Sequence, residues 1–94
     1  MAVTQVTTAG TVQVKLGGGR LYNVVGISAG TSMTYQIKDG PDVNGNSRLL
    51  FGGTAIPVVA GQNLRQAGYE PIQFTNGLQF VIGGTPGEVD VEFD

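Results

Sequence analysis

Most of this chain consists of short stretches in which apolar and polar residues alternate. A period of two places every second side chain on the same face, which is typical of half-buried β-strands. The clearest case has Met33, Tyr35 and Ile37 separated by single polar residues. Sixteen glycines and four prolines interrupt the stretches, and both residue types disfavour helix interiors. We therefore predict strands at 3–8, 11–16, 20–27, 33–39, 48–51, 54–59, 71–74, 77–82 and 88–93.

The alternation also predicts which side chains face the core. Val12, Val14 and Leu16 should share one face, with Gln13 and Lys15 on the other. In the segment 20–27 both sets of alternating positions contain apolar residues, so this strand is predicted to be buried on both sides. The chain holds no long helical pattern, and only a turn or two of helix fits between Gly61 and Gly68, around 62–66.

Strands of this number and length, separated by turn residues, predict an all-β fold. We expect a single small β-sandwich or jelly-roll-like barrel of about eight short antiparallel strands. Residues 1–18 are predicted to form an N-terminal strand pair or an arm, and residues 19–94 the sandwich domain. Of the two N-terminal alternatives, the valine spacing favours a hairpin that turns at Ala9-Gly10.

The small size of the chain limits the stability that its core can provide. A domain of 94 residues buries only about 60–65% of the surface that its unfolded chain exposes. With no cysteine in the sequence, disulfides cannot supplement this thin core. We therefore expect a homo-oligomer, with a trimer as the favoured form.

Charge and hydropathy exclude several classes of partner. Five basic residues and a net charge of −2 provide no basic stripe for a phosphate backbone, so no nucleic-acid partner is expected. The longest apolar runs are far shorter than the roughly 20 residues of a membrane-spanning helix, so no membrane partner is expected either. The N-terminus lacks the features of a secretory signal, which predicts synthesis and retention in the cytoplasm.

The residue types needed for most catalytic chemistry are missing. There is no histidine and no cysteine, which removes the usual zinc, iron and copper ligands and the base of a serine or cysteine triad. We expect a non-enzymatic protein with no catalytic residue, no cofactor-binding residue, no metal ligand and no cofactor.

The segment from Lys38 to Arg48 offers the best candidate metal ligands. It holds four oxygen-bearing side chains at close spacing, on Asp39, Asp42, Asn44 and Asn46, and calcium prefers such ligands. A late acidic residue that would bind in bidentate fashion is lacking. We favour a hairpin connection with a type I′ turn at Asn44-Gly45 instead.

The C-terminal segment combines an apolar face with an acidic one. Val89, Val91 and Phe93 are predicted to face the core, and the acids between them to face water or a partner; these acids are Glu88, Asp90, Glu92 and Asp94. Glu88 and Asp90 would stand about 7 Å apart, within the range of a glycosidase pair. Because carboxylates on one strand face point in parallel, we favour a solvated acidic row that protects a sheet edge.

Three stretches resemble small structural proteins of tailed-phage virions. They are Gly19-Arg-Leu-Tyr-Asn-Val-Val25, the run from Leu49 to Gln62, and the run from Pro71 through Gly-Thr-Pro-Gly87 into the last strand. The resemblance spans about residues 19–94. It implies a capsid decoration or cement protein, or a head-fibre protein, that is part of the virion and binds the major capsid protein or another virion protein.

A second hypothesis is a carbohydrate- or host-surface-binding module of a phage fibre. Such modules stack sugar rings on exposed Trp or Tyr side chains. The chain has no Trp and three Tyr, so an exposed row of aromatics would favour this hypothesis, and an extensive flat self-contact would favour the decoration protein.

Overall fold

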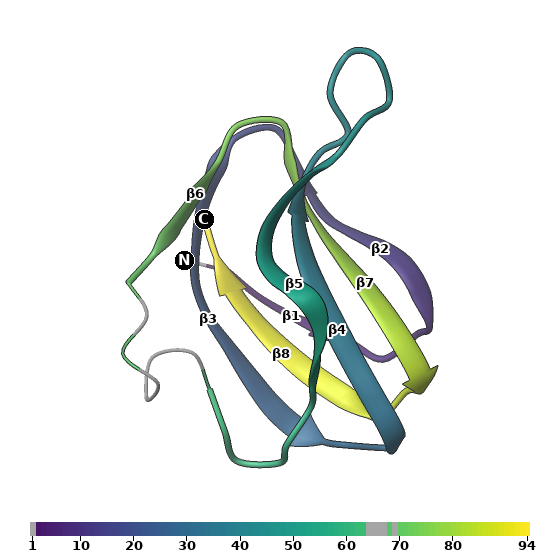
Figure 1. Cartoon of the computed structure of the whole chain (residues 1–94). Helices are drawn as coiled ribbons and strands as arrows, with labels where there is room; N and C mark the ends of the chain where they lie inside the picture. Colours follow the sequence, from purple (N-terminus) through teal and green to yellow (C-terminus); the bar gives the residue numbers. More distant parts are fainter. Residues whose placement is uncertain (1, 64–67, 69) are drawn as a thin grey trace.

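The computed structural model describes residues 2–63, 68 and 70–94, and it folds them into two four-stranded antiparallel sheets packed face to face (Figure 1). The all-β prediction is confirmed. No helix in this part of the chain is long and apolar enough to cross a membrane. The strands are β1 (Ala2–Val6), β2 (Gly10–Leu16), β3 (Gly19–Ser28), β4 (Thr31–Asp39), β5 (Arg48–Pro57), β6 (Ile72–Phe74), β7 (Gly77–Thr85) and β8 (Glu88–Phe93).

The strand order is that of a jelly roll. Sheet A has the order β1-β8-β3-β6, and sheet B has the order β2-β7-β4-β5. The first strand therefore pairs with the last, the second with the seventh, the third with the sixth and the fourth with the fifth. Only the β4–β5 connection stays within one sheet; the other connections cross between the sheets. This double-sheet arrangement buries one face of every strand.

The core lies between the sheets and follows the alternation of the sequence. Met33, Tyr35 and Ile37 of β4 are buried as predicted, and Val89, Val91 and Phe93 of β8 are buried opposite them. The ring of Tyr35 stacks on that of Phe80, with the centroids 6.0 Å apart. Among the residues whose burial is described, the buried apolar ones are Val6, Leu21, Val24, Met33, Tyr35, Ile37, Val58, Phe74, Leu78, Phe80, Ile82, Val89, Val91 and Phe93.

The predicted facing of β2 is wrong at its end. Val12 and Val14 pack against the core, but Leu16 is 73% exposed. The register with β7 shifts between Gln13 and Lys15, so β2 has one extra residue there. Such a bulge reverses the alternation for all later residues, and Leu16 consequently turns towards solvent.

Strand pairing also corrects two local predictions. The predicted hairpin at Ala9-Gly10 is not formed, because β1 and β2 lie in different sheets. The two strands predicted at 48–51 and 54–59 are one strand, β5. The segment 61–63 pairs with β3 through Gly26, whose N–H donates to the Gln62 carbonyl and whose carbonyl accepts from Gly61 N–H. Most of the helical turn predicted around 62–66 lies outside the described residues.

Candidate functional site on the outer face of sheet A

The outer face of sheet A carries a row of carboxyl groups along β8. Glu88, Asp90 and Glu92 alternate with the buried valines of this strand and are half-buried themselves. Their placement on the outer face is as predicted, but the role of an edge protector is wrong. β8 lies between β1 and β3, so its backbone is paired on both sides and has no open edge to protect. The row stands in the middle of the face.

Two of these carboxyl groups interact directly. A hydrogen bond with Asp90 raises the pKa of Glu88, and partial desolvation and the negative charge of Asp90 act in the same direction. The Gln5 amide donates to Glu88 Oε2 at 3.4 Å. Asp90 Oδ1 is buried and has no hydrogen-bond partner in the described part of the chain. The two carboxyl groups stand side by side on one face of the sheet, which is not the opposed arrangement that glycoside hydrolysis requires.

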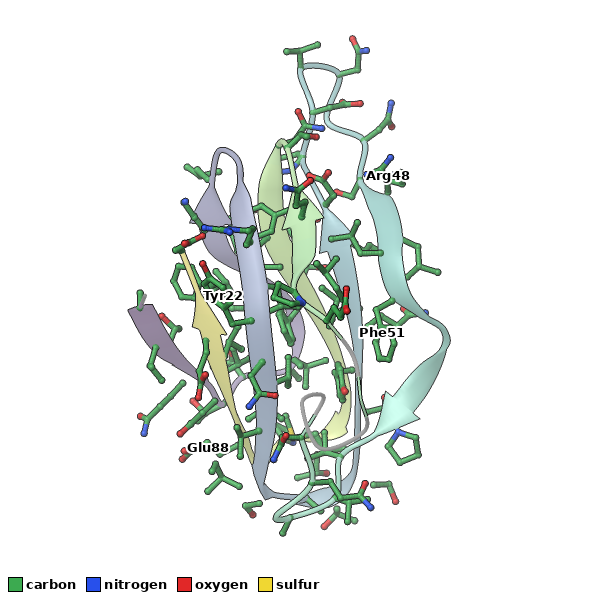
Figure 2. The ribbon with its side chains drawn as sticks, turned by 90° about the vertical axis from the view of Figure 1, so that its left-hand side faces the viewer. Tyr22, Arg48, Phe51 and Glu88 are labelled. Carbon is green, nitrogen blue, oxygen red and sulfur yellow. The ribbon has the colours of Figure 1, made fainter. Side chains whose placement is uncertain are left out.

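The fourth acid of the segment, Asp94, is neutralised locally. Tyr22 donates its hydroxyl proton to Asp94 Oδ2 at 2.5 Å, and Arg20 Nη2 lies 3.4 Å from the same oxygen. The hydrogen bond from Tyr22, together with the charge of Arg20, lowers the pKa of Asp94. Figure 2 shows Tyr22 and Glu88 on the same side of the molecule, away from Arg48 and Phe51 of β5. The unneutralised acids are therefore Glu88, Asp90 and Glu92.

Two of the four candidate calcium ligands, Asp42 and Asp39, accept hydrogen bonds from backbone amides. Asp42 Oδ1 accepts hydrogen bonds from the Asn44 and Asn46 amides at 2.9 and 3.0 Å, which rigidifies the loop that projects beyond the sheets in Figure 1. Asp39 points instead into the fold. Within residues 2–63, 68 and 70–94, no three acidic, histidine or cysteine side chains group to hold a metal ion.

The β4–β5 hairpin is present, but its turn is not type I′. Gly45 N–H donates to the Asp42 carbonyl, and Asp42 N–H donates to the Asn46 carbonyl. Gly45 has a φ of 80°, whereas Asn44 is outside the positive-φ region. This is a type I turn followed by a left-handed glycine, the usual three-residue hairpin loop.

The turn allows a direct test of the calcium hypothesis. Gly45→Val should lower the free energy of unfolding by about 1–2 kcal/mol, because a β-branched residue is strained at this φ. A chelator should leave the melting temperature of the wild-type protein unchanged, since a bound ion would add stability by mass action. A chelator-induced drop of several degrees would contradict the hairpin interpretation.

Asp39, which the sequence offered as a candidate calcium ligand, is a structural residue at the end of β4. Its carboxylate is 2% exposed and accepts from the Thr75 amide at 2.9 Å, the Thr75 hydroxyl at 3.0 Å, and the Asn76 and Gly77 amides at 2.8 and 3.3 Å. Burial alone would raise the pKa of Asp39, but these hydrogen bonds outweigh it and the pKa is lowered. The signal was available, because Asp39 continues the inward series of Met33, Tyr35 and Ile37.

The aromatic side chains do not form an exposed row in the described part of the chain. Tyr35, Phe74, Phe80 and Phe93 are buried. Tyr22 and Phe51 are half-buried, and Tyr22 is held by Asp94. Tyr69 lies outside the described residues. The stacking platform that would favour a carbohydrate-binding module is therefore not found among the rings whose positions are described.

Comparison of the chain with protein-family models, with curated proteins and with solved structures gave no match. The fold is established by its strand order. The likeness to phage virion proteins remains a prediction from the quoted stretches of sequence.

Proposed function

We propose that this chain is a non-enzymatic phage virion protein that decorates or cements the outer surface of the head by binding the major capsid protein. The observation that carries the proposal is the jelly-roll strand order in a chain whose segments resemble virion proteins. Jelly rolls are a common architecture of viral capsid proteins and of lectins. The fold supports the proposal by analogy only, so the surface must supply the physical argument.

The docking surface in this proposal is the acidic row of Glu88, Asp90 and Glu92. Like charges on one strand repel one another. The pKa of Glu88 is raised first by its hydrogen bond with Asp90, and then by partial desolvation and the negative charge of Asp90. A group with a raised pKa in the folded state stabilises the fold below its unfolded pKa and loses this contribution as the pH rises. At neutral pH the acidic row therefore does not stabilise the fold. Features that lower the stability of a protein are concentrated at functional sites, so the row is a candidate binding surface.

A binding experiment with phage heads tests both parts of the proposal. Wild-type protein should sediment with heads that lack it, and its affinity should fall as salt rises, because salt screens the attraction to a basic patch on the capsid. The neutral variant Glu88→Gln/Asp90→Asn/Glu92→Gln should bind at least about tenfold more weakly, a loss of about 1.4 kcal/mol. Its stability should equal or slightly exceed that of the wild type.

Asp42→Asn is the matched control, since it removes one negative charge from the exposed β4–β5 loop and should leave binding to heads unchanged. Binding of the neutral variant at wild-type strength in any salt would refute the acidic docking surface. If the wild-type protein fails to bind heads at all, the decoration role itself is wrong.

A further inference from the structure

The four edge strands of the sandwich differ in how their open sides are protected. Sheet edges are usually blocked by charges, proline, bulges or short length. β2 contains a bulge and Lys15. β5 has irregular register, begins at Arg48 and ends at Pro57. β6 has only three residues. β1, Ala-Val-Thr-Gln-Val, has no charge, no proline and no bulge, and among the described strands it pairs with β8 only.

The backbone groups that point out from β1 can be identified from the hydrogen bonds of its neighbours. Asp94 and Arg20 exchange both backbone hydrogen bonds, so Asp94 points its N–H and C=O towards β3. Successive residues of a strand point these groups to alternate sides, so Val89, Val91 and Phe93 point theirs towards β1. Their partners in β1 are Val6, Thr4 and Ala2.

The hydrogen bonds of Gly26 give the same assignment independently. Gly26 uses its N–H and C=O on the segment 61–62, away from β8, so its partner Val89 must point towards β1. The remaining residues of β1, Val3 and Gln5, therefore direct their N–H and C=O groups to the open edge. Figure 2 shows β1, in dark purple, at the outer side of the sheet beside the yellow β8.

We propose that this open edge binds a second copy of the chain, strand β1 against strand β1, in antiparallel orientation across a two-fold axis. Full overlap of the five residues places Thr4 on the axis. Val3 of each copy then pairs with Gln5 of the other copy. Both are hydrogen-bonded pairs, because these residues present their N–H and C=O to the open edge. The two four-stranded sheets become one continuous sheet.

A second copy fits this edge for two physical reasons. An uncharged strand brings no like charges together when it meets its own copy, and the acidic rows of the two β8 strands stand three strand spacings apart, about 14 Å. That exceeds the Debye length of about 8 Å at physiological salt. The thin core of so short a chain also leaves stability to be gained from association. Such a contact is isologous and makes a dimer, whereas the trimer expected from the sequence rested on size, which does not select a subunit number.

Hydrogen exchange measured at several protein concentrations tests the proposed edge contact. At low concentration the amides of Thr4 and Val6 should exchange slowly, because they bond to β8, and those of Val3 and Gln5 should exchange fast. At the higher concentrations, where sedimentation shows that the dimer forms, the exchange rates of the Val3 and Gln5 amides should fall by at least about tenfold. A monomer at every concentration, or a dimer or trimer in which these two amides still exchange fast, would overturn the proposal.

A pair of proline substitutions separates the edge contact from folding. Val3→Pro removes an N–H that the isolated fold does not use, so the variant should fold but dimerise at least about tenfold more weakly. Val43→Pro is the matched control. Val43 is 99% exposed at the second position of a type I turn, where proline is favoured, so this variant should dimerise like the wild type. Dimerisation of folded Val3→Pro at wild-type strength would refute the contact, and if Val3→Pro does not fold, the exchange experiment decides.

The inference does not depend on the proposed virion role. Dimerisation is measured on the free protein and docking is measured on heads, so each can fail alone.

Discussion

Truncation of the chain after Gly87 should abolish the fold. The deleted strand β8 holds Val89, Val91 and Phe93, which are at most 9% exposed. Their burial contributes about 5 kcal/mol or more, and a domain of this size has a net stability of only about 5–14 kcal/mol. The loss is compounded by topology, because β8 separates β1 from β3 and its removal leaves both strands unpaired on that side. Circular dichroism and NMR dispersion of the truncated protein should show an unfolded chain.

Single substitutions in the same strand provide the control for the truncation. Val91→Ala should lower the free energy of unfolding by about 2 kcal/mol, since it removes buried methyl groups. Asp90→Asn, at the neighbouring outward position, should leave the free energy of unfolding unchanged or raise it slightly. Urea unfolding measures both. Native-like spectra from the truncated chain, or equal effects of the two substitutions, would contradict the central position of β8 in the core.

Asp39→Ala should destabilise the domain by about 3 kcal/mol. The substitution removes an acceptor shared by three backbone amides and the Thr75 hydroxyl, and hydrogen bonds to a charged acceptor are among the stronger ones. These bonds join the end of β4 to the turn between β6 and β7, which links the two sheets. Asp42→Ala is the comparison, because Asp42 accepts two backbone amides in an exposed loop and should cost only about 1 kcal/mol.

The pH dependence of stability tests the charge of Asp39 separately. Its pKa is lowered from the ordinary value of 3.8, so its contribution is fully present above that value and is lost as the pH falls through the lower pKa of the folded state. Wild-type stability should therefore fall in acid below about pH 4, and the fall should be smaller in Asp39→Ala. Parallel acid unfolding curves for the two proteins would show that Asp39 does not carry this contribution.

The buried face of a strand could be predicted where apolar and polar residues alternate along it without interruption. The regular alternation of β4 and β8 gave the correct inward faces of Met33, Tyr35, Val89 and Val91. Leu16 was misplaced because a bulge is a property of two paired strands, and its partner β7 is some sixty residues away in sequence.

The pairing of strands was the part that local pattern could not supply. A period of two identifies the buried face of a strand but not its neighbours. The sequence therefore indicated the acidic face of β8, while its position in the middle of sheet A required the jelly-roll order. The same applies to β1. Its unprotected edge can be recognised only once its position beside β8, at the end of sheet A, is known.

Cryo-electron microscopy of virions that carry this gene would test the central claim most directly. The proposed role predicts jelly-roll density for this chain on the outer surface of the head, with the acidic face of β8 against a basic patch of the major capsid protein. Purified virions that lack the chain by mass spectrometry, and show no density for it on the head, would contradict the account.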